Sequence, residues 1–258
     1  MGNDKERSAY EKVKISRKSN RPGIMDYING LFSHFIEMHG DRLYKDDPAI
    51  VGGIALFHDV PVTVIGTKKA HEPEENLKCN FGMASPEGYR KARRLMEQAE
   101  KFHRPVITFI DTPGAYPGIE AESNGQSNAI AESLAFMSRM QVPSIAIITG
   151  EGNSGGALGL ALSDRVYMLE NAVYSILSPE GFASILWKDS KQADRAAELM
   201  KLTAQELLSF GLIDSIIKED SAFLRNLDML LERDLRDLIR MKKSALLESR
   251  RQKYRKVV

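Results

Sequence analysis

Pro105–Ile110 is an apolar stretch that runs into Asp111-Thr-Pro-Gly-Ala-Tyr-Pro-Gly118, and Ser144–Thr149 runs in the same way into Gly150-Glu-Gly-Asn-Ser-Gly-Gly156. Each apolar stretch predicts a buried strand, followed by a glycine-rich loop and a helix. Glycine at such a corner leaves backbone N–H groups open to a ligand, and the helix start adds partial positive charge. The two corners therefore predict stabilisation of a carbonyl-derived oxyanion by main-chain donors, without attack by a side chain.

The segments before the first corner alternate between helices and strands. Apolar residues at helical spacing predict a helix over 26–40, and apolar runs at 51–57 and 61–65 predict a hairpin. Residues 68–80 are polar and show no periodicity. Ser85-Pro86 predicts the start of an amphipathic helix, because serine caps helices and proline favours the first helical position.

Shorter elements follow the second corner. Strands are predicted at 166–169 and 173–177, and Ser178-Pro179 predicts another helix start. Thr203-Ala-Gln-Glu206 is a capping box that precedes a short strand at 212–217. The rest of the chain predicts one long amphipathic helix or a pair. The expected class is α/β, with strand, glycine loop and helix recurring as right-handed crossovers.

The composition predicts one catalytic domain in the cytoplasm. The chain has 258 residues, of which 43% are hydrophobic and 28% charged, and no apolar run approaches the roughly 20 residues that span a bilayer. Met1-Gly-Asn-Asp-Lys-Glu6 has no apolar segment behind its charges, and Glu6 stands where myristoylation of Gly2 needs Ser or Thr. The single cysteine, Cys79, excludes an internal disulfide and a cysteine metal cluster, so we expect no metal site.

Both ends of the chain are basic. Residues 1–23 carry seven Lys/Arg against three Asp/Glu, and residues 240–258 carry eight against one. We interpret 1–23 as a basic N-terminal arm, 24–220 as the catalytic domain and 221–258 as an amphipathic helical extension with a basic end. The basic ends are either solvated helices or contacts for an acidic partner or for phosphates. Nucleic acid is disfavoured, because no binding motif is present.

The second corner also fits the nucleophile-elbow pattern of serine hydrolases, with Ser154 between glycines. All five histidines precede Ser154, whereas that fold places its histidine last. A serine–lysine dyad stays open, with candidate lysines at Lys68, Lys69, Lys188 and Lys191. Asp111 is either a base or a turn cap. Phosphate-loop, dinucleotide and zinc-protease motifs are absent.

Several long motifs point to one known family. They are Gly52-Gly-Ile-Ala55, Asn80-Phe-Gly-Met83, Pro86-Glu-Gly-Tyr-Arg-Lys91, the two glycine corners and Ser178-Pro-Glu-Gly-Phe-Ala-Ser-Ile-Leu-Trp-Lys188. Through these motifs the chain closely resembles the α subunits of bacterial acetyl-CoA carboxylase carboxyltransferase, from about Ile24 to Ile217 and beyond. Long motifs in the family's order are far more specific than a single glycine loop.

The resemblance implies a crotonase-like fold of repeated β-β-α units with helices flanking both ends. It implies transfer of a carboxyl group from carboxybiotin, on the biotin carboxyl carrier protein, to acetyl-CoA, giving malonyl-CoA for fatty acid synthesis. It further implies a β subunit with a zinc ribbon, an α2β2 assembly and cooperation with biotin carboxylase. Carboxybiotin and acetyl-CoA are then substrates, no cofactor is held covalently, and zinc belongs to the partner.

The resemblance also implies roles for individual residues. Gly114 and Ala115 are expected to hold the biotin carbonyl through backbone N–H groups, while Gly155 and Gly156 shape the facing wall. Further substrate contacts are expected at Tyr116, Pro117, Gly118, Gly152 and Ser154. The oxyanion left on biotin then takes a proton from the acetyl methyl group, which explains why the corners carry no side-chain base.

The chain departs from the family's usual pattern near these residues. Glu120, Ser123 and Asn124 replace the usual glycine, glutamate and arginine, and Asn153 replaces a glycine. His71 lies in a stretch that replaces the usual His-Gln-Lys-Gly. These departures leave the acyl-CoA and the carrier open.

Two other functions stay open beside the carboxyltransferase. One is a stand-alone enoyl-CoA hydratase or isomerase, for which Asp111, Glu120 and Glu151 are available as acidic catalysts. The other is a non-catalytic scaffold subunit, which would bind a β subunit without contributing to turnover.

Overall fold

A single mixed sheet organises the computed structural model, which describes residues 7–256. Residues 1–6 and 257–258, which include Gly2, Glu6 and the outer parts of both basic ends, lie outside the described residues. The strand order is β1-β2-β3-β4-β5-β6-β8, and β7 pairs with β5. The strands are β1 (Ser33–Glu37), β2 (Ile50–Phe57), β3 (Val60–Thr67), β4 (Val106–Thr112), β5 (Ser144–Asn153), β6 (Arg165–Leu169), β7 (Val173–Ser175) and β8 (Ser215–Ile217).

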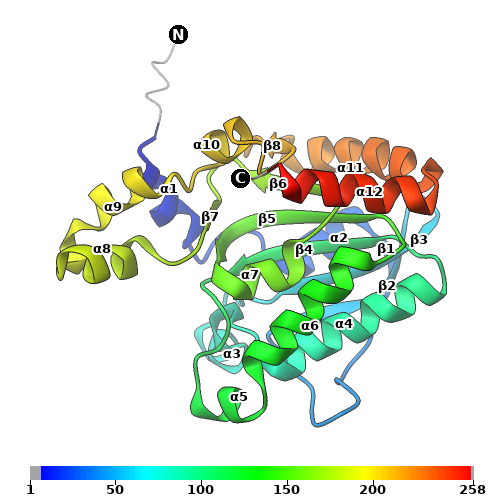
Figure 1. Ribbon diagram of the computed structural model, residues 1–258, viewed down its shortest axis with the longest axis horizontal. Helices are drawn as coiled ribbons and strands as arrows, with labels where there is room; N and C mark the ends of the chain where they lie inside the picture. Colours follow the sequence, from blue (N-terminus) through cyan, green and yellow to red (C-terminus); the bar gives the residue numbers. More distant parts are fainter. Residues whose placement is uncertain (1–6, 257–258) are drawn as a thin grey trace.

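Helices cover both faces of this sheet (Figure 1). They are α1 (Ala9–Ser16), α2 (Ile24–Leu31), α3 (Pro73–Lys78), α4 (Pro86–Lys101), α5 (Ile119–Ser123), α6 (Gln126–Arg139), α7 (Ser154–Ala161), α8 (Pro179–Trp187), α9 (Ala193–Met200), α10 (Ala204–Ser209), α11 (Phe223–Arg240) and α12 (Lys243–Arg255), with 3-10 turns η1 (Asn80–Gly82) and η2 (Ser190–Gln192). On one face α4, α6 and α7 pack together. On the other, α2 lies against β1 and β3 and contacts α11.

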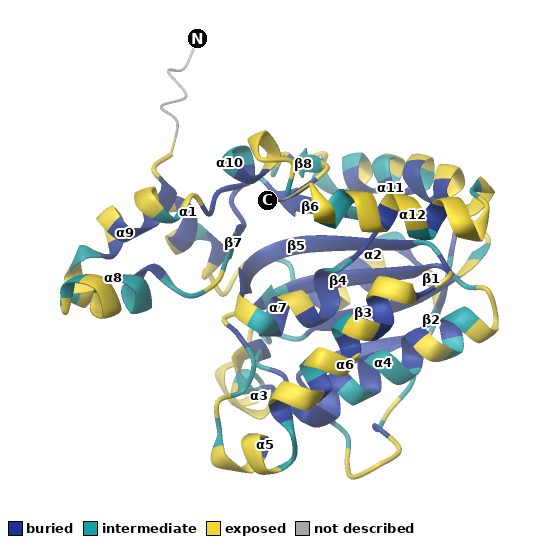
Figure 2. Cartoon of the chain, viewed as in Figure 1, coloured by how far each residue is buried: buried dark blue, intermediate teal, exposed yellow. Residues whose placement is uncertain are grey.

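The core lies between the sheet and these helices (Figure 2). Every residue of β5 is buried, and β4 is buried except at Asp111. Parallel strands that are covered on both faces need apolar side chains on both faces, which explains the continuous apolar runs in the sequence. Helix α11 contributes a buried stripe of leucines at helical spacing, namely Leu227, Leu231, Leu235 and Leu238.

The direction of the strands places the two corners together. β3, β4, β5 and β6 are parallel, with Val106 opposite Ser144 and Ile110 opposite Ile148. The carboxyl ends of parallel strands meet at one edge of a sheet, where open α/β folds bind their ligands. Both predicted corners follow such ends, so they lie at this edge.

The predicted hairpin at 51–57 and 61–65 is confirmed. β2 and β3 pair antiparallel from Ile50 opposite Thr67 to Phe57 opposite Val60. His58 and Asp59 form the turn with φ of +44° and +64°, as in the two-residue turns that match strand twist.

The predicted helix over 26–40 is wrong in its second half. Helix α2 ends at Leu31, and β1 follows as an edge strand with Ile36 opposite Ile54. Phe35 packs on the core from this strand, so helical spacing of apolar residues described two elements as one. Ile36 is 66% exposed, which a core-facing helix would not allow. Asp26 lies in the first turn of α2, where its carboxylate accepts the Gly23 N–H at 2.7 Å.

The predicted loop after Thr149 is also wrong in part. β5 continues to Asn153, because β7 supplies a new parallel partner beyond the end of β6. Gly152 pairs with Tyr174 and Asn153 with Ser175. The glycine-rich stretch is therefore mostly strand, and the turn into α7 is confined to Asn153 and Ser154.

Most of the predicted helix starts are confirmed. Pro86 and Pro179 each occupy the first turn of a helix, and the Ser178 hydroxyl accepts the Gly181 N–H at 3.1 Å. The capping box at Thr203 and Glu206 is present. The C-terminal segment is a pair of helices, α11 and α12. Residues 68–80, predicted to lack periodic structure, contain the short helix α3.

The basic ends bind the rest of the chain. Helix α1 buries Val13 against Ala197 and Leu202 in a small second core beside α9. Arg250 of α12 is 1% exposed and forms a bidentate ion pair with Asp164. The described parts of both ends are thus packed on the fold and are not solvated arms. The division of the chain into an arm, a catalytic domain and an extension, at residues 23 and 220, stays a prediction. Over residues 7–256, no helix is both long and apolar enough to cross a membrane.

Candidate active site

The first corner begins where β4 ends at Thr112. Gly114 has φ +147°, a backbone conformation that favours glycine. The Thr112 hydroxyl donates to the Gly114 carbonyl oxygen at 2.7 Å and accepts the Gly114 N–H at 3.1 Å. The N–H of half-buried Ala115 has no hydrogen-bond partner within the described chain. Ala115 is therefore the donor that this loop leaves free, while the Gly114 N–H is engaged.

The second corner is the abrupt change from β5 to α7. Asn153 is extended, and Ser154 has φ +58°, which is uncommon for a residue with a side chain. The Asn153 Oδ1 accepts the Ser175 hydroxyl at 2.9 Å, tying the end of β5 to β7. The first-turn N–H groups of a helix lack intrahelical partners, so the start of α7 is a second source of donors.

Gly156 holds the two corners in contact. A β-carbon on Gly156 would lie 2.4 Å from Ala115 N and 2.4 Å from Gly114 C, both backbone atoms. Real β-carbons do not approach backbone that closely, so only glycine permits this packing. The free Ala115 N–H is thus positioned directly against the first turn of α7.

A cleft of about 550 Å³ opens above these corners. Pro113, Gly114 and Ala115 line it from the first corner, and Ser154 lines it from the second. The remaining wall consists of Arg17, Glu151, Ile176, Leu177 and Ser178. The cleft therefore combines main-chain groups from both corners with charged side chains.

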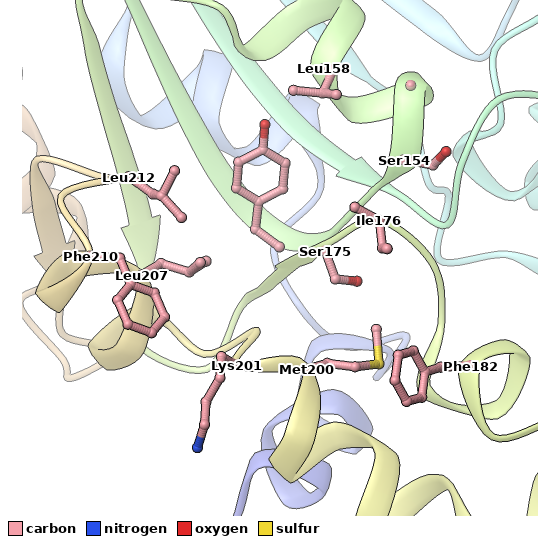
Figure 3. A pocket seen from close by; sticks show the side chains of 12 residues that line it. Ser154, Leu158, Ser175, Ile176, Phe182, Met200, Lys201, Leu207, Phe210 and Leu212 are labelled. Atoms are coloured by element: carbon pink, nitrogen blue, oxygen red, sulfur yellow. The ribbon is translucent and has the colours of Figure 1, made fainter. Parts of the chain in front are cut away.

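An apolar pocket of about 540 Å³ adjoins this cleft and shares Ser154 and Ile176 with it. Figure 3 shows Phe182 and Met200 facing Leu158 across the pocket, with Leu212 at one side. Several large apolar side chains around α8 to α10 stay exposed, including Ile185 at 70% and Phe210 at 57%. Exposed apolar side chains gathered around an apolar pocket are typical of interaction sites.

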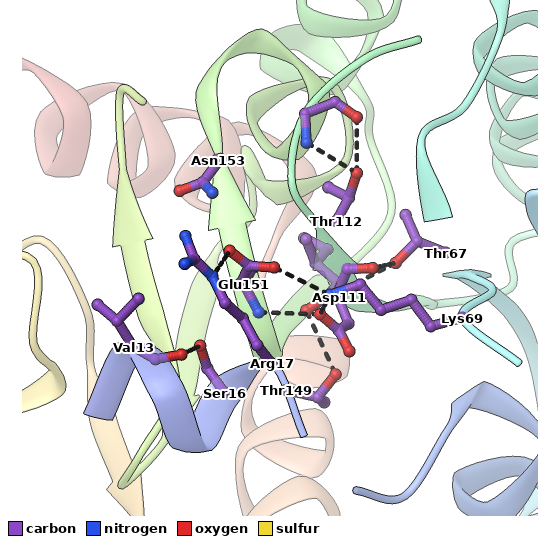
Figure 4. Close-up of polar contacts among 12 residues, drawn as sticks. Val13, Ser16, Arg17, Thr67, Lys69, Asp111, Thr112, Thr149, Glu151 and Asn153 are labelled. Carbon is purple, nitrogen blue, oxygen red and sulfur yellow. Dashed lines mark hydrogen bonds and ion pairs between the residues drawn. The ribbon is translucent and has the colours of Figure 1, made fainter. Parts of the chain in front are cut away.

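A partly buried ion-pair network extends from the cleft wall, where Arg17 and Glu151 lie, to Lys69 and Asp111 (Figure 4). Lys69 Nζ lies 2.6 Å from Asp111 Oδ1 and 3.2 Å from Glu151 Oε2. Arg17 Nε lies 2.8 Å from Glu151 Oε1, and the same guanidinium binds Glu180 at 2.7 Å. The Asp111 carboxylate also accepts the Glu151 N–H at 2.9 Å. The network joins β3, β4, β5 and α8 to the segment after α1.

The network keeps its cations charged. Burial works to lower the pKa of Lys69, but the carboxylates of Asp111 and Glu151 outweigh it and raise that pKa. Burial likewise opposes the Arg17 charge, yet the bonds to Glu180 and Glu151 raise the Arg17 pKa. Hydrogen bonding to Arg17 lowers the pKa of Glu180. These groups serve as fixed charges at neutral pH.

The predicted site residues lie in several different surroundings. Gly114, Ala115 and Ser154 line the cleft, Gly155 lines the apolar pocket, and Gly156 makes the contact between the corners. Gly152 is buried in the β5 ladder. Tyr116 lines a separate cavity of about 180 Å³, and Pro117 and Gly118 do not line the cleft. Their substrate contacts stay predictions.

The side chains considered as acidic catalysts or as a serine–lysine dyad either form ion pairs or lack the partner that the chemistry needs. Asp111 and Glu151 are both ion-paired, and Glu120 pairs with Lys45 at 2.9 Å on the surface. Within residues 7–256 no hydrogen bond joins Ser154 to a lysine, and Lys69 is held by carboxylates. The geometry thus favours main-chain donors over an acidic pair or a serine–lysine dyad.

The departures from the family pattern lie in three places: at α5, at Asn153 of the second corner and at His71 after β3. The Asn124 carbonyl accepts Arg90 at 3.0 Å, and Ser123 is exposed at the end of α5. His71 Nδ1 bonds the Ser19 carbonyl at 2.6 Å, which raises the pKa of His71. His71 therefore holds the segment after α1 rather than facing the cleft.

With this geometry in view, comparison with known proteins decides the family. The family model described as acetyl co-enzyme A carboxylase carboxyltransferase-like matches residues 5–258. The α subunit of the acetyl-coenzyme A carboxylase carboxyl transferase of Halalkalibacterium halodurans is 54% identical over 256 residues, covering 96% of this chain and 79% of the relative. The chain belongs to the acetyl-CoA carboxylase carboxyltransferase α-subunit family.

Other relatives agree with membership of the α-subunit family. The protein of the same name from Clostridium botulinum is 61% identical over 212 residues, covering 82% of this chain and 77% of the relative. Among solved structures, transcarboxylase 12S matches with TM-score 0.70 at 18% identity, covering 84% of this chain and 42% of that chain. A Pseudomonas malonate decarboxylase hetero-tetramer matches with TM-score 0.67 at 16% identity, covering 79% and 85%. These two show the fold alone, and the expected crotonase-like α/β fold is confirmed.

Sequence reasoning missed two charged members of this α-subunit site. Arg17 and Glu180 are 163 residues apart, and neither belongs to a glycine corner. Arg17 carried only the general signal of a basic end. Ser178 was predicted as a helix cap, and it lies in the cleft wall with Ile176 and Leu177, the two residues that join it to the end of β7.

Proposed function

We propose that this chain is the α subunit of an acetyl-CoA carboxylase carboxyltransferase, moving the carboxyl group of carboxybiotin to acetyl-CoA to form malonyl-CoA. The observation that carries the proposal is the contact at Gly156, which brings Ala115, with its free N–H, against the start of α7, where Ala115 and Ser154 line one cleft. Family membership supplies the reaction class.

In the proposed reaction the N–C bond of carboxybiotin breaks, releasing CO2 and leaving negative charge on the ureido oxygen. That oxygen takes a proton from the acetyl methyl group, and the resulting carbanion attacks CO2. Donors already aimed at a developing oxyanion are worth about 3 kcal/mol each. Ala115 is the first-corner donor that we favour. Gly114 joins it only if its N–H leaves Thr112.

The apolar pocket and the exposed side chains of α8 to α10 support the need for a partner. We propose that a β subunit covers them and brings the zinc ribbon, in an α2β2 assembly. The same proposal includes delivery of carboxybiotin by the biotin carboxyl carrier protein, its loading by biotin carboxylase, and a cytoplasmic location.

The test is reconstitution. The full chain, mixed with the β subunit from the same source, is expected to carboxylate acetyl-CoA from carboxybiotin, and the chain alone is expected to be inactive. Malonyl-CoA formation is followed with and without the partner. Hydration of an enoyl-CoA by the chain alone would contradict the proposal and favour the stand-alone enzyme.

One variant and one mixing experiment separate the remaining functions. Ser154→Ala is expected to keep most of the transfer activity, since the proposed donors are main-chain groups. Complete loss in Ser154→Ala would favour a serine nucleophile. If the β subunit forms malonyl-CoA at the same rate with and without this chain, the chain is a non-catalytic scaffold subunit.

A further inference from the structure

A further cavity lies at the opposite edge of the sheet from the cleft. It has a volume of about 370 Å³, within the range of small-molecule sites. Its floor is formed where the strands begin, at Val60, Pro105 and Pro143, and α11 and α12 contribute Ile239 and Leu246. β5 runs from this edge to the catalytic corner, so the cavity is separate from the proposed active site (Figure 1).

The walls of this cavity are apolar and open to solvent at one side. Phe102 and Ile239, which line it, are 57% and 46% exposed. Leu246 and Val142 are only 2% and 3% exposed and form the inner surface of the cavity. Covering partly exposed apolar side chains with an apolar ligand favours binding by about 25 cal/mol per Å² of apolar surface buried.

The rim of the cavity is cationic and lacks acidic partners. His103, Arg104 and Lys243 line it, and none of them forms an ion pair within residues 7–256. Arg104 donates only to neutral groups, Thr63 Oγ1 at 3.2 Å and Gln98 Oε1 at 3.1 Å. Burial alone lowers the pKa of Arg104.

The acidic side chain beside this rim is already used. Glu100 accepts the backbone N–H of Gln141 at 2.6 Å and forms no ion pair with the three rim groups. Arg90 and Arg250 pair with carboxylates, whereas half-buried Arg94, like Arg104, donates only to neutral groups. A half-buried guanidinium without a counter-ion, next to an apolar cavity, leaves a place for an external anion.

We infer that this cavity binds an amphiphilic anion, an alkyl chain that ends in a carboxylate. The chain fills the apolar interior between the strand starts and α11. The carboxylate lies at the rim, where Arg104 and Lys243 neutralise it. The cavity and the cleft lie at opposite ends of β5, so a ligand in the cavity does not compete for the cleft.

Dodecanoate is the probe, titrated into the full chain by calorimetry. The wild-type chain is expected to bind one equivalent saturably, and the uncharged dodecanol and the short butyrate are expected to bind at least about tenfold more weakly, a difference of 1.4 kcal/mol. Vesicles of phosphatidylglycerol test whether the cavity instead binds an anionic lipid in a membrane surface. Binding to vesicles without binding of free dodecanoate would overturn the assignment.

Matched variants locate the ligand. Ile239→Glu puts a negative charge in the cavity wall at an exposed position and is expected to weaken dodecanoate binding at least about tenfold. Met229→Glu, 52% exposed on the same helix, is expected to bind as wild type. Arg104→Met is expected to weaken binding, whereas Arg195→Met, another arginine stacked on an aromatic ring, is not. Absent saturable binding, or equal binding by Ile239→Glu and Met229→Glu, would refute the site.

Discussion

Single residues at the corners carry backbone strain and close contacts that no hydrophobic pattern reveals. Ser154 has φ +58° with an exposed side chain that makes no hydrogen bond within the described chain. Its conformation is required by the abrupt turn from β5 to α7. The cost of such a backbone is of order 1–3 kcal/mol, and it is characteristic of functional sites.

Ser154→Gly is expected to stabilise the folded chain by about 1 kcal/mol, because glycine adopts positive φ without a steric penalty. Urea unfolding measures the change. Ser138→Gly, within the regular helix α6, is the control and should destabilise by roughly 0.5–1 kcal/mol. A loss of stability in Ser154→Gly equal to that in Ser138→Gly would show that the turn holds no strain.

Asp46 makes the stability of the fold depend on pH through its ion pair with the buried Lys91. Their charged groups lie 2.8 Å apart, and Lys91 is 1% exposed. Burial works to raise the pKa of Asp46, but Lys91 and the Gly40 N–H outweigh it and lower that pKa to about 2. A carboxyl group whose pKa is lower in the folded than in the unfolded chain stabilises the fold at pH values above its unfolded-state pKa. This stabilisation is lost as the pH falls toward the folded-state pKa.

Asp46→Asn is therefore expected to be less stable than wild type at pH 6, with a difference that shrinks between about pH 4 and pH 2. The unfolding free energy of both chains across this range is the measurement. A difference that stays constant down to pH 2 would mean that the Asp46 charge is not responsible.

At the scale of elements, α12 is held by one buried arginine. Arg250 places its guanidinium on Asp164 and on the carbonyls of Met137, Met140 and Val142, at 2.7 to 3.2 Å. These contacts use the donors of its planar fork, so a basic residue from the C-terminal end closes the gap between α6 and β6. Arg250→Met leaves Asp164 buried without its partner.

Arg250→Met is expected to lower the free energy of unfolding by about 3–5 kcal/mol, the usual effect of breaking a buried ion pair. Arg251→Met, at an exposed neighbouring position, is expected to change it by less than about 0.5 kcal/mol. Thermal or urea unfolding distinguishes them. Similar small effects in both variants would show that α12 is not anchored through Arg250.

The elements also show where prediction from sequence succeeds. Capping residues at Ser178 and Thr203 and the turn at His58 act locally, so their elements were predicted correctly. The break at Phe32 and the extension of β5 to Asn153 depend on strand partners that are distant in sequence. Tertiary pairing decided both, which explains why apolar spacing and glycine content misassigned them.

On the scale of the whole molecule, the site is assembled from segments that only folding brings together. The two corners could be predicted, because glycine loops follow strands that read as buried. Arg17 and Glu180 could not, because a surface arginine and a helix-start glutamate have no local signal for an ion pair across the fold. The free donor also proved to be Ala115, since Thr112 engages the Gly114 N–H.

The proposed active site depends on the contact between the corners at Gly156, and one substitution tests this contact. Gly156→Ala would push a β-carbon into the backbone of Gly114 and Ala115, and misplacement by about 1 Å can cost about 100-fold in rate. The control is Gly30→Ala in α2, where the added carbon meets only the flexible Leu224 side chain at 3.3 Å.

Carboxyl transfer to acetyl-CoA is measured with the β subunit present, after size-exclusion chromatography and circular dichroism show that both variants fold and assemble. We expect Gly156→Ala to lose about 100-fold in kcat and Gly30→Ala to keep the wild-type rate. A folded, assembled Gly156→Ala variant with wild-type transfer would contradict the proposed active site.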